Sequence, residues 1–211
     1  VYTALDRPYT QGRHYGKSSM KIYIDMDDVV ADWHAAAEQF LKMRWSKDNE
    51  RIPQADWDRI KHNSHFYRNL PLKEDAKTLV EYCTDAVKIG LAEGVYFLTA
   101  LPHDYSMPYT AQDKVWWANS HFPGIPVFFG PFSHDKWRYC KSPEDILIDD
   151  RHSNCREWIE AGGKSHIYKN WSEKILREPL KLTLKLRADA SRKTNSISIV
   201  PYFGQSRIAI F

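Results

Sequence analysis

Four aspartates lie directly after an apolar stretch near the start of the chain. The segment KIYI at 21–24 runs into Asp25, Asp27, Asp28 and Asp32. If KIYI is a parallel strand, these carboxylates stand at the edge where open α/β sheets form their ligand sites. Carboxylates this close repel one another unless a cation neutralises them, and hard oxygen ligands favour Mg²⁺. The alternative is a solvated acidic turn in which Asp27 or Asp28 caps a helix.

A second acidic pair repeats this arrangement. In DILIDDR, at 145–151, an apolar run ends in Asp149 and Asp150. Neighbouring parallel strands would bring both acidic sets to one edge of a sheet, which favours a shared site over an acidic turn. Between the two sets, Thr99 ends the apolar run VYFLTA and Lys136 lies in SHDKWRYC. A hydroxyl, an ammonium and carboxylates with a divalent metal are the groups needed to hold a phosphoryl group during its transfer.

Short apolar runs alternate with helical periods from residue 21 onward, as in α/β sheets with crossover helices. Apolar runs of this kind indicate parallel strands that are covered on both faces. We therefore predict a Rossmann-like α/β fold, a three-layer arrangement around a parallel sheet. The expected strands are 21–24, 95–100, 125–129, 145–148 and 165–168, and the expected helices are 73–91, 110–121 and 153–162, the last capped by Ser153 or Asn154 and closed by Gly162 and Gly163.

The stretch from about residue 30 to 70 does not follow this alternation. It is helical in pattern, polar and aromatic, and it separates the first strand from the rest of the sheet. We predict that it forms a small helical cap inserted after the first strand. Its aromatic residues include Trp33, Trp57, Phe66 and Tyr67.

Length and composition indicate one globular domain with an insertion or tails. The chain has 211 residues, of which 43% are hydrophobic and 27% charged, which excludes a disordered chain or a coiled coil. No run approaches eighteen apolar residues and no secretory signal pattern begins the chain, so we expect no membrane span and a cytoplasmic protein. Three cysteines without CxxC spacing predict reduced thiols rather than a disulfide framework or a zinc site.

The positive charge belongs to the two ends of the chain. The formal charge is +3, yet residues 1–20 carry +2 and residues 180–211 carry +5, which leaves −4 for residues 21–179. An acidic body does not suit tracking of a phosphate backbone, so we do not expect a nucleic-acid partner. The expected organisation is a leader or flexible arm at 1–19, a catalytic domain at 20–178 and a basic C-terminal tail at 179–211, whose role the sequence does not reveal.

In order and context, the chemistry-bearing residues resemble the four motifs of the haloacid dehalogenase-like phosphohydrolases. Over residues 21–175, the phrases DMDxVxADW, FYRNLPL, KVWWANSHFPG and DILIDDR resemble more narrowly the 5′(3′)-deoxyribonucleotidase branch, also called 5′-nucleotidase type C. Two positions depart from this pattern and leave substrate details open. Asp28 stands where the family commonly has Gly, and Ala100 stands where the branch often has Ser.

The resemblance implies a role for each residue of the motifs. Asp25 would be the nucleophile that forms an aspartyl-phosphate. Asp27 would protonate the leaving nucleoside oxygen and then activate the hydrolytic water. Mg²⁺ would be held by Asp25, the backbone carbonyl of Asp27, and the pair Asp149 and Asp150. The phosphate oxygens would be bound by Thr99, Lys136 and the backbone N–H of Ala100.

Substrate choice is expected to depend on the cap. Trp33 resembles an aromatic of the base-stacking pocket of the nucleotidases, and Trp57, Phe66 and Tyr67 would add to it; the alternative is that these rings form the core of the cap. Arg151, next to Asp150, and Lys114 would lie close to the phosphate. For Lys114 the favoured alternative is an ordinary surface residue of its helix.

The resemblance implies an Mg²⁺-dependent phosphatase that hydrolyses (deoxy)ribonucleoside monophosphates to nucleoside and phosphate. One alternative is a phosphatase that acts on a sugar phosphate or on a terminal phosphate of a nucleic acid. Another is a non-catalytic binding protein on the same fold, although the complete set of motif residues weighs against it. The sequence does not decide the base and sugar preference or the choice between 5′ and 3′ phosphates. It also leaves open whether the protein forms a homodimer.

Overall fold

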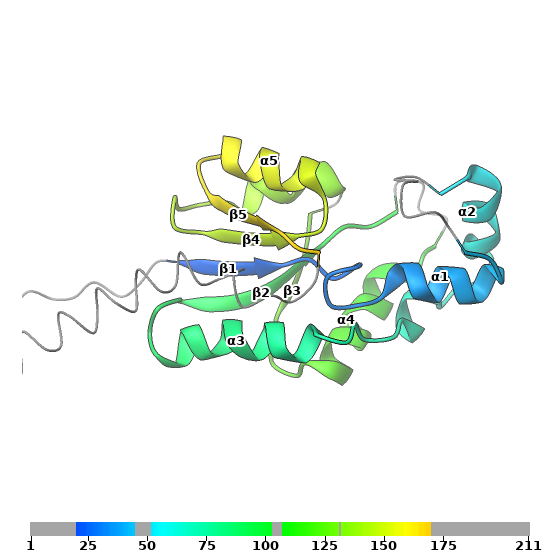
Figure 1. Cartoon of the computed structure of the whole chain (residues 1–211), viewed down its shortest axis with the longest axis horizontal. Coiled ribbons are helices and arrows are strands. Elements are labelled where there is room, and N and C mark those ends of the chain that lie inside the picture. Colours follow the sequence, from blue (N-terminus) through cyan, green and yellow to red (C-terminus); the bar gives the residue numbers. More distant parts are fainter. Residues whose placement is uncertain (1–19, 45–51, 103–106, 131, 170–211) are drawn as a thin grey trace, which may run out of the picture. The chain divides into compact units, whose positions relative to one another are not determined.

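The computed structural model describes residues 20–44, 52–102, 107–130 and 132–169. The centre of this part is a five-stranded, all-parallel sheet with the strand order β3-β2-β1-β4-β5 (Figure 1). Each predicted strand is present, and its ends shift by no more than two residues. The strands are β1 (Lys21–Ile24), β2 (Gly94–Thr99), β3 (Val127–Phe129), β4 (Ile146–Asp149) and β5 (Lys164–Ile167).

The register of the central strand explains why the motifs meet. Ile24, the last residue of β1, pairs with Phe97 of β2 and with Ile148 of β4. The backbone N–H of Asp25 then donates to the carbonyl of Ile148 at 2.9 Å. Since the strands are parallel, the residues that follow their carboxyl ends lie at one edge of the sheet.

Helices cover both faces of the sheet, which confirms the three-layer α/β fold. Figure 1 shows α5 on one side and α3 on the other. On the α5 side, Tyr23 and Leu147 pack with Trp158, and the Tyr23 and Trp158 ring centroids are 5.2 Å apart. On the other side, Phe97 packs against Phe122, with 5.6 Å between ring centroids. The helices outside the cap are α3 (Ala76–Lys88), α4 (Thr110–His121), the 3₁₀ helix η2 (Ser133–Tyr139) and α5 (His152–Glu160).

The predicted helical cap follows β1 and lies beyond the carboxyl ends of the strands in Figure 1. The chain leaves and re-enters the core side by side, because Ala31 forms an antiparallel bridge with Leu72. Asp32 caps α1 by accepting a hydrogen bond from the Ala35 N–H at 3.1 Å, so the N-cap is neither Asp27 nor Asp28. The cap consists of α1 (Trp33–Leu41), α2 (Gln54–Lys61) and the 3₁₀ helix η1 (Phe66–Asn69).

The predicted N-cap of α5 is wrong. This helix begins at His152 with Arg151 in the N-cap position, and the Arg151 side chain makes no capping hydrogen bond. Asn154 is buried, and its amide binds the carboxylate of Asp149 instead of a backbone N–H. A buried carboxylate needs several donors, and this need overrides the usual preference of Asn for a cap. The helix ends just before Gly162, which has a φ of +95°, as the sequence predicts.

The three cysteines are free thiols. No helix in the described part of the chain is long and apolar enough to cross a membrane. The predicted leader and the basic tail lie outside the described residues.

Candidate active site

Lys136 of η2 joins the carboxyl ends of the two neighbouring strands β1 and β4. Its Nζ lies 2.7 Å from Asp25 Oδ1 and 2.7 Å from Asp149 Oδ2. All three residues are buried. Burial alone would lower the pKa of Lys136, but the carboxylates of Asp149 and Asp25 raise it above its ordinary value. Lys136 is therefore charged, and it compensates part of the negative charge at this edge.

Asp149 is held by a set of donors that fixes both of its oxygens. Asn154 Nδ2 donates to Oδ1 at 2.9 Å and to Oδ2 at 3.0 Å, and the Arg151 N–H donates to Oδ1 at 2.9 Å. The amide of Asn154 is oriented in turn, because its Oδ1 accepts a hydrogen bond from Ser133 Oγ at 2.9 Å. Asn154 is a site residue that the sequence analysis missed. Its position five residues after Asp149, in the first turn of a helix, was the available signal.

Three carboxylates form a cluster that could hold a metal ion. Asp25, Asp149 and Asp150 each offer one oxygen, and these oxygens lie within 4.8 Å of one another. Burial raises the pKa of Asp25 to about 7, against the opposing effect of Lys136 and with further increases from Asp149 and Asp27. Burial, followed by the charges of Asp25, Asp149 and Asp28, raises the pKa of Asp150 to about 8. The ionised form of this cluster is thus unfavourable without added positive charge.

The residues present fit a hard divalent cation. Asp25, Asp149 and Asp150 would carry three negative charges when ionised, and the ammonium group of Lys136 contributes one positive charge. The remaining charge of −2 equals in magnitude that of one divalent cation. Carboxylate oxygens are the ligands that Mg²⁺ prefers, and they fit it better than they fit a softer metal.

The prediction that Lys114 is a surface residue is wrong. Only 1% of the residue is exposed, and its Nζ lies 2.6 Å from Asp27 Oδ2 and 2.7 Å from Thr99 Oγ1. The same atom lies 4.7 Å from the ring centroid of Tyr67. Two adjacent charged residues such as Asp113 and Lys114 are typical of a solvent-exposed helix face. In the structure, however, both residues are buried. Lys114 therefore belongs with Asp27 and Thr99 at the edge of the sheet.

Asp28 stands at a backbone position that favours glycine. Its φ is +59°, in the left-handed region, which explains why Gly is suited to this place and why the short side chain of Asp is tolerated there. Its carboxylate accepts from the His34 N–H at 3.0 Å and lies 2.6 Å from His34 Nδ1. The extra acid is thus bound to the start of α1, although its charge still raises the pKa of Asp150. Ala100 lies half-buried beside Thr99.

The aromatic residues of the cap differ in their surroundings. Trp33 and Phe66 are buried against each other, with 5.7 Å between ring centroids, and Trp57 lies half-buried 6.2 Å from Trp33. These rings form the core of the cap in the described structure. Tyr67 is also buried, and it is the ring that contacts a charged group of the site, Lys114. Arg151 is exposed next to Asp150.

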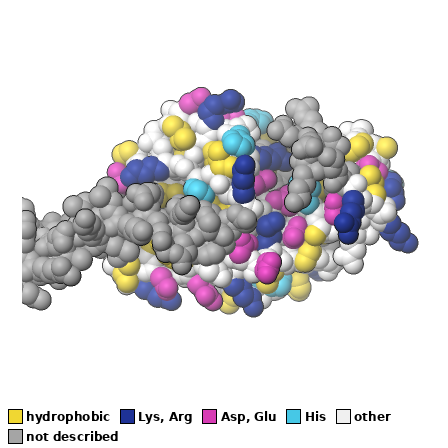
Figure 2. All heavy atoms as spheres, viewed as in Figure 1, with side chains coloured by type: hydrophobic (Ala, Val, Ile, Leu, Met, Phe, Trp, Pro, Cys, Tyr) yellow, Lys and Arg dark blue, Asp and Glu magenta, His cyan; other side chains and the backbone are white. Residues whose placement is uncertain are grey.

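Charged side chains of both signs lie on the face seen in Figure 2. There, Lys and Arg are interspersed with Asp and Glu rather than gathered into one basic patch.

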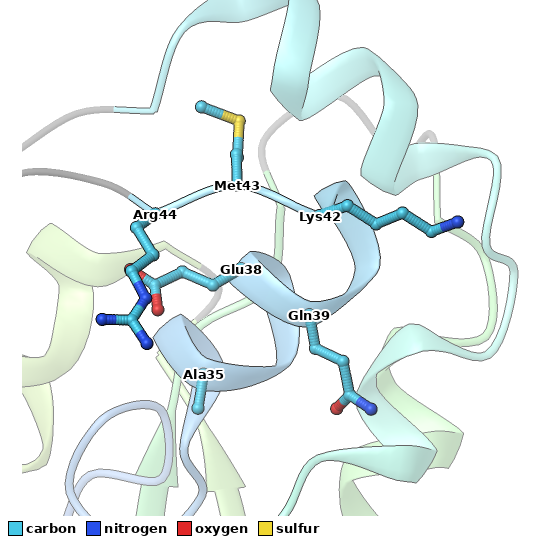
Figure 3. Close-up of a pocket in the computed structure, with 6 residues that line it drawn as sticks. All are labelled: Ala35, Glu38, Gln39, Lys42, Met43 and Arg44. Carbon is cyan, nitrogen blue, oxygen red and sulfur yellow. The ribbon is translucent and has the colours of Figure 1, made fainter.

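A hollow of about 490 Å³ lies beside α1 (Figure 3). Its lining contains none of the predicted site residues, so the candidate site is the edge of the sheet and not this hollow. The lining residues are Ala35, Glu38, Gln39, Lys42, Met43 and Arg44.

Comparison with solved structures finds hydrolases of the haloacid dehalogenase-like (HAD) superfamily at low identity. The putative HAD-hydrolase YfnB from Bacillus subtilis, bound to magnesium, is 13% identical over 75% of this chain and 92% of its own, with a TM-score of 0.42. A HAD family enzyme from Bacteroides thetaiotaomicron, in complex with magnesium and inorganic phosphate, is 14% identical over 74% and 98% of the two chains, with a TM-score of 0.42. A haloacid dehalogenase-like hydrolase from Xanthomonas campestris is 13% identical over 85% and 96%, with a TM-score of 0.46.

The search of curated proteins finds no match. The model of one protein family, described as "5′ nucleotidase, deoxy (Pyrimidine), cytosolic type C protein", matches residues 18–170. This match spans more than half of the chain and includes every motif at the edge of the sheet. The chain therefore belongs to the 5′-nucleotidase type C family of HAD-like phosphohydrolases, as its motifs indicate.

Proposed function

We propose that this protein is an Mg²⁺-dependent phosphatase that hydrolyses nucleoside monophosphates, preferably deoxyribonucleotides, to nucleoside and phosphate. One observation carries the proposal most directly. Asp25 lies at the carboxyl end of the central strand, bound to the ammonium of Lys136 and clustered with Asp149 and Asp150. Membership of the 5′-nucleotidase type C family supports the substrate class.

The metal would be held by the carboxylates of Asp25, Asp149 and Asp150 together with the backbone carbonyl of Asp27. Bound Mg²⁺ would supply positive charge that offsets the charge of the phosphate and stabilises the transition state. Asn154 and the Arg151 N–H keep the Asp149 carboxylate in one orientation, which prepares it for this role.

Asp25 would act as the nucleophile. A carboxylate oxygen of Asp25 attacks phosphorus, the bond from phosphorus to the nucleoside oxygen breaks, and an aspartyl-phosphate forms. An anionic nucleophile approaches an anionic phosphate only where positive charge is close. Lys136 provides it, because its Nζ is 2.7 Å from Asp25 Oδ1.

Asp27 would be the general acid and base. In the first step it gives its proton to the departing nucleoside oxygen, and in the second it takes a proton from the water that attacks the aspartyl-phosphate. Release of phosphate then regenerates Asp25 as a carboxylate and Asp27 in its protonated form. Thr99, the N–H of Ala100 and Lys136 would bind the non-bridging phosphate oxygens.

A substrate panel tests the proposal. Purified protein with Mg²⁺ is assayed for phosphate release from deoxyribonucleoside monophosphates, ribonucleoside monophosphates, sugar phosphates and 3′-phosphorylated oligonucleotides. We expect the highest kcat/KM on a deoxyribonucleoside monophosphate. A preference for a sugar phosphate or an oligonucleotide would show that the proposed substrate class is wrong. Hydrolysis of none of these substrates would favour a binding protein on the same fold.

A further inference from the structure

Lys114 connects α4 to the carboxyl ends of β1 and β2. A buried ammonium is unfavourable unless opposite charges and hydrogen-bond acceptors replace the water that it loses. Lys114 has three such partners, namely the carboxylate of Asp27, the hydroxyl of Thr99 and the face of the Tyr67 ring. Two of the three belong to the proposed reaction, so the cost of burial is met by groups of the site itself.

The contact with Thr99 fixes the direction of its hydroxyl hydrogen. An ammonium only donates hydrogen bonds, so Thr99 Oγ1 is the acceptor in the 2.7 Å contact with Lys114 Nζ. The hydroxyl hydrogen of Thr99 is then left for a different acceptor. A phosphate oxygen bound at the end of β2 is such an acceptor.

The contact with Asp27 distinguishes its two oxygens. Lys114 Nζ binds Oδ2 at 2.6 Å, whereas Oδ1 is buried and has no hydrogen-bond partner within the described residues. Lys114 therefore holds the Asp27 carboxylate through Oδ2, the oxygen that its ammonium contacts.

The helix that carries Lys114 is anchored on its other side to the cap. Asp113 is fully buried, and its Oδ1 accepts from Arg68 Nε at 2.9 Å and lies 3.1 Å from His65 Nδ1. Asp113 and Lys114 are adjacent, so one residue fixes the start of α4 to the cap and the next reaches the edge of the sheet. The backbone at Lys114 is thus held by contacts of Asp113 with the cap, and the Lys114 ammonium is held by Asp27 and Thr99.

We propose that Lys114 is a positioning residue for the hydrolysis, which fixes the Asp27 carboxylate at the edge of the sheet and leaves the Thr99 hydroxyl hydrogen for a phosphate oxygen. This inference rests on the proposed function. It goes beyond the motif residues, because Lys114 acts through Asp27 and Thr99 and takes no covalent part in the reaction.

The test compares two leaving groups in the first turnover. Departure of a nucleoside alkoxide needs a proton from Asp27, whereas p-nitrophenolate leaves without one. We expect Lys114→Met to slow first-turnover release of nucleoside from a deoxyribonucleoside monophosphate about 100-fold, the low end of what a positioned general acid contributes. Release of p-nitrophenolate from p-nitrophenyl phosphate should slow far less. Lys114→Arg, which keeps the charge, should restore part of the nucleoside rate.

Lys88→Met is the matched control, because the side chain of Lys88 is 72% exposed in its pair with Asp85. It should leave both rates unchanged. Equal slowing of both leaving groups by Lys114→Met, or no slowing of either, would overturn the proposal. If circular dichroism shows that Lys114→Met does not fold, Lys114→Leu, which also removes the donor to Asp27, is measured in the same way and is subject to the same criterion.

The activity of the wild-type protein distinguishes a failure of this inference from a failure of the proposed function. If wild type and Lys88→Met hydrolyse the nucleotide and Lys114→Met equals them, only the role of Lys114 is contradicted. If wild type hydrolyses no nucleotide but does hydrolyse another alkyl phosphate, the proposed substrate is contradicted, and that alkyl phosphate replaces the nucleotide in the same comparison. If wild type hydrolyses no phosphomonoester, both proposals fail.

Discussion

Asp25 Oδ1 and Lys136 Nζ lie 2.7 Å apart at the carboxyl end of the central strand, both buried. The same ammonium also binds Asp149, the last residue of the neighbouring strand β4, which pairs with β1. One lysine therefore reduces the repulsion between carboxylates that the parallel sheet brings together. Burial, together with the negative charge that remains, raises the pKa values of Asp25 and Asp150.

Magnesium should stabilise the protein more at high pH than at low pH. The folded-state pKa of Asp25, about 7, and that of Asp150, about 8, lie above the ordinary value of 3.8. In the metal-free protein, protonation of these two carboxyl groups contributes to the free energy of unfolding. This contribution is fully present below about pH 4 and is lost as the pH rises through 7 to 8. A bound cation needs the ionised carboxylates, so it competes with these protons. We expect the Mg²⁺-induced rise in Tm to be larger at about pH 8.5 than at about pH 6.

Differential scanning fluorimetry with and without Mg²⁺ measures this effect, and Asp150→Asn is the informative variant. It should lose most of the Mg²⁺-induced shift at high pH. An equal shift at both pH values in the wild type would contradict the assignment of Mg²⁺ to this carboxylate cluster.

Asn154→Ala should weaken metal binding and destabilise the fold. Its amide donates to both oxygens of the buried Asp149, and no other side chain in the described structure reaches both of them. Loss of a donor behind a metal ligand typically reduces metal affinity about 10- to 100-fold. Leaving the carboxylate short of a donor costs about 1 to 3 kcal/mol in the free energy of unfolding.

Isothermal titration with Mg²⁺ and urea denaturation measure the two effects. Asn69→Ala, at an exposed residue whose amide binds the backbone carbonyl of His65, is the control. Unchanged Mg²⁺ affinity in Asn154→Ala would show that Asp149 does not depend on this amide for its orientation.

Trp33→Ala should act mainly on stability. Trp33 is 7% exposed and packs against Phe66 and Trp57 in the core of the cap. Truncation of a buried Trp costs about 3 to 5 kcal/mol in the free energy of unfolding. Urea denaturation should show this loss, and Trp33→Phe should recover much of it. A rise in KM for nucleotides with little change in stability would instead support a base-stacking role for Trp33.

The fold and the motif residues could be predicted because their signals are local. Each apolar run indicates its own strand, and the residues at the end of each run, or directly after it, are placed at the edge of a parallel sheet by topology alone. Asp25, Thr99 and Asp149 follow this rule, and the register of β1, β2 and β4 places all three at that edge.

Lys114 and Asn154 could not be placed in this way. Lys114 binds Asp27 across 87 positions of sequence, and its helix has polar residues on several sides, so no period marks its buried face. Asn154 lies only five positions from Asp149, but its residue type is ordinary for the start of a helix. In both cases a carboxylate at the edge of the sheet determines where the side chain goes, and this contact is a property of the packed structure.

The most direct test of the account is hydrolysis of a deoxyribonucleoside monophosphate by wild type and by Asp25→Asn, each with Mg²⁺ and with EDTA. We expect wild type to be active with Mg²⁺ and inactive with EDTA. Asp25→Asn should be folded and should show at least about 1,000-fold lower kcat, because the nucleophile that forms the aspartyl-phosphate is lost. Undiminished activity in Asp25→Asn would contradict the assignment of Asp25 as the nucleophile and, with it, the proposed mechanism.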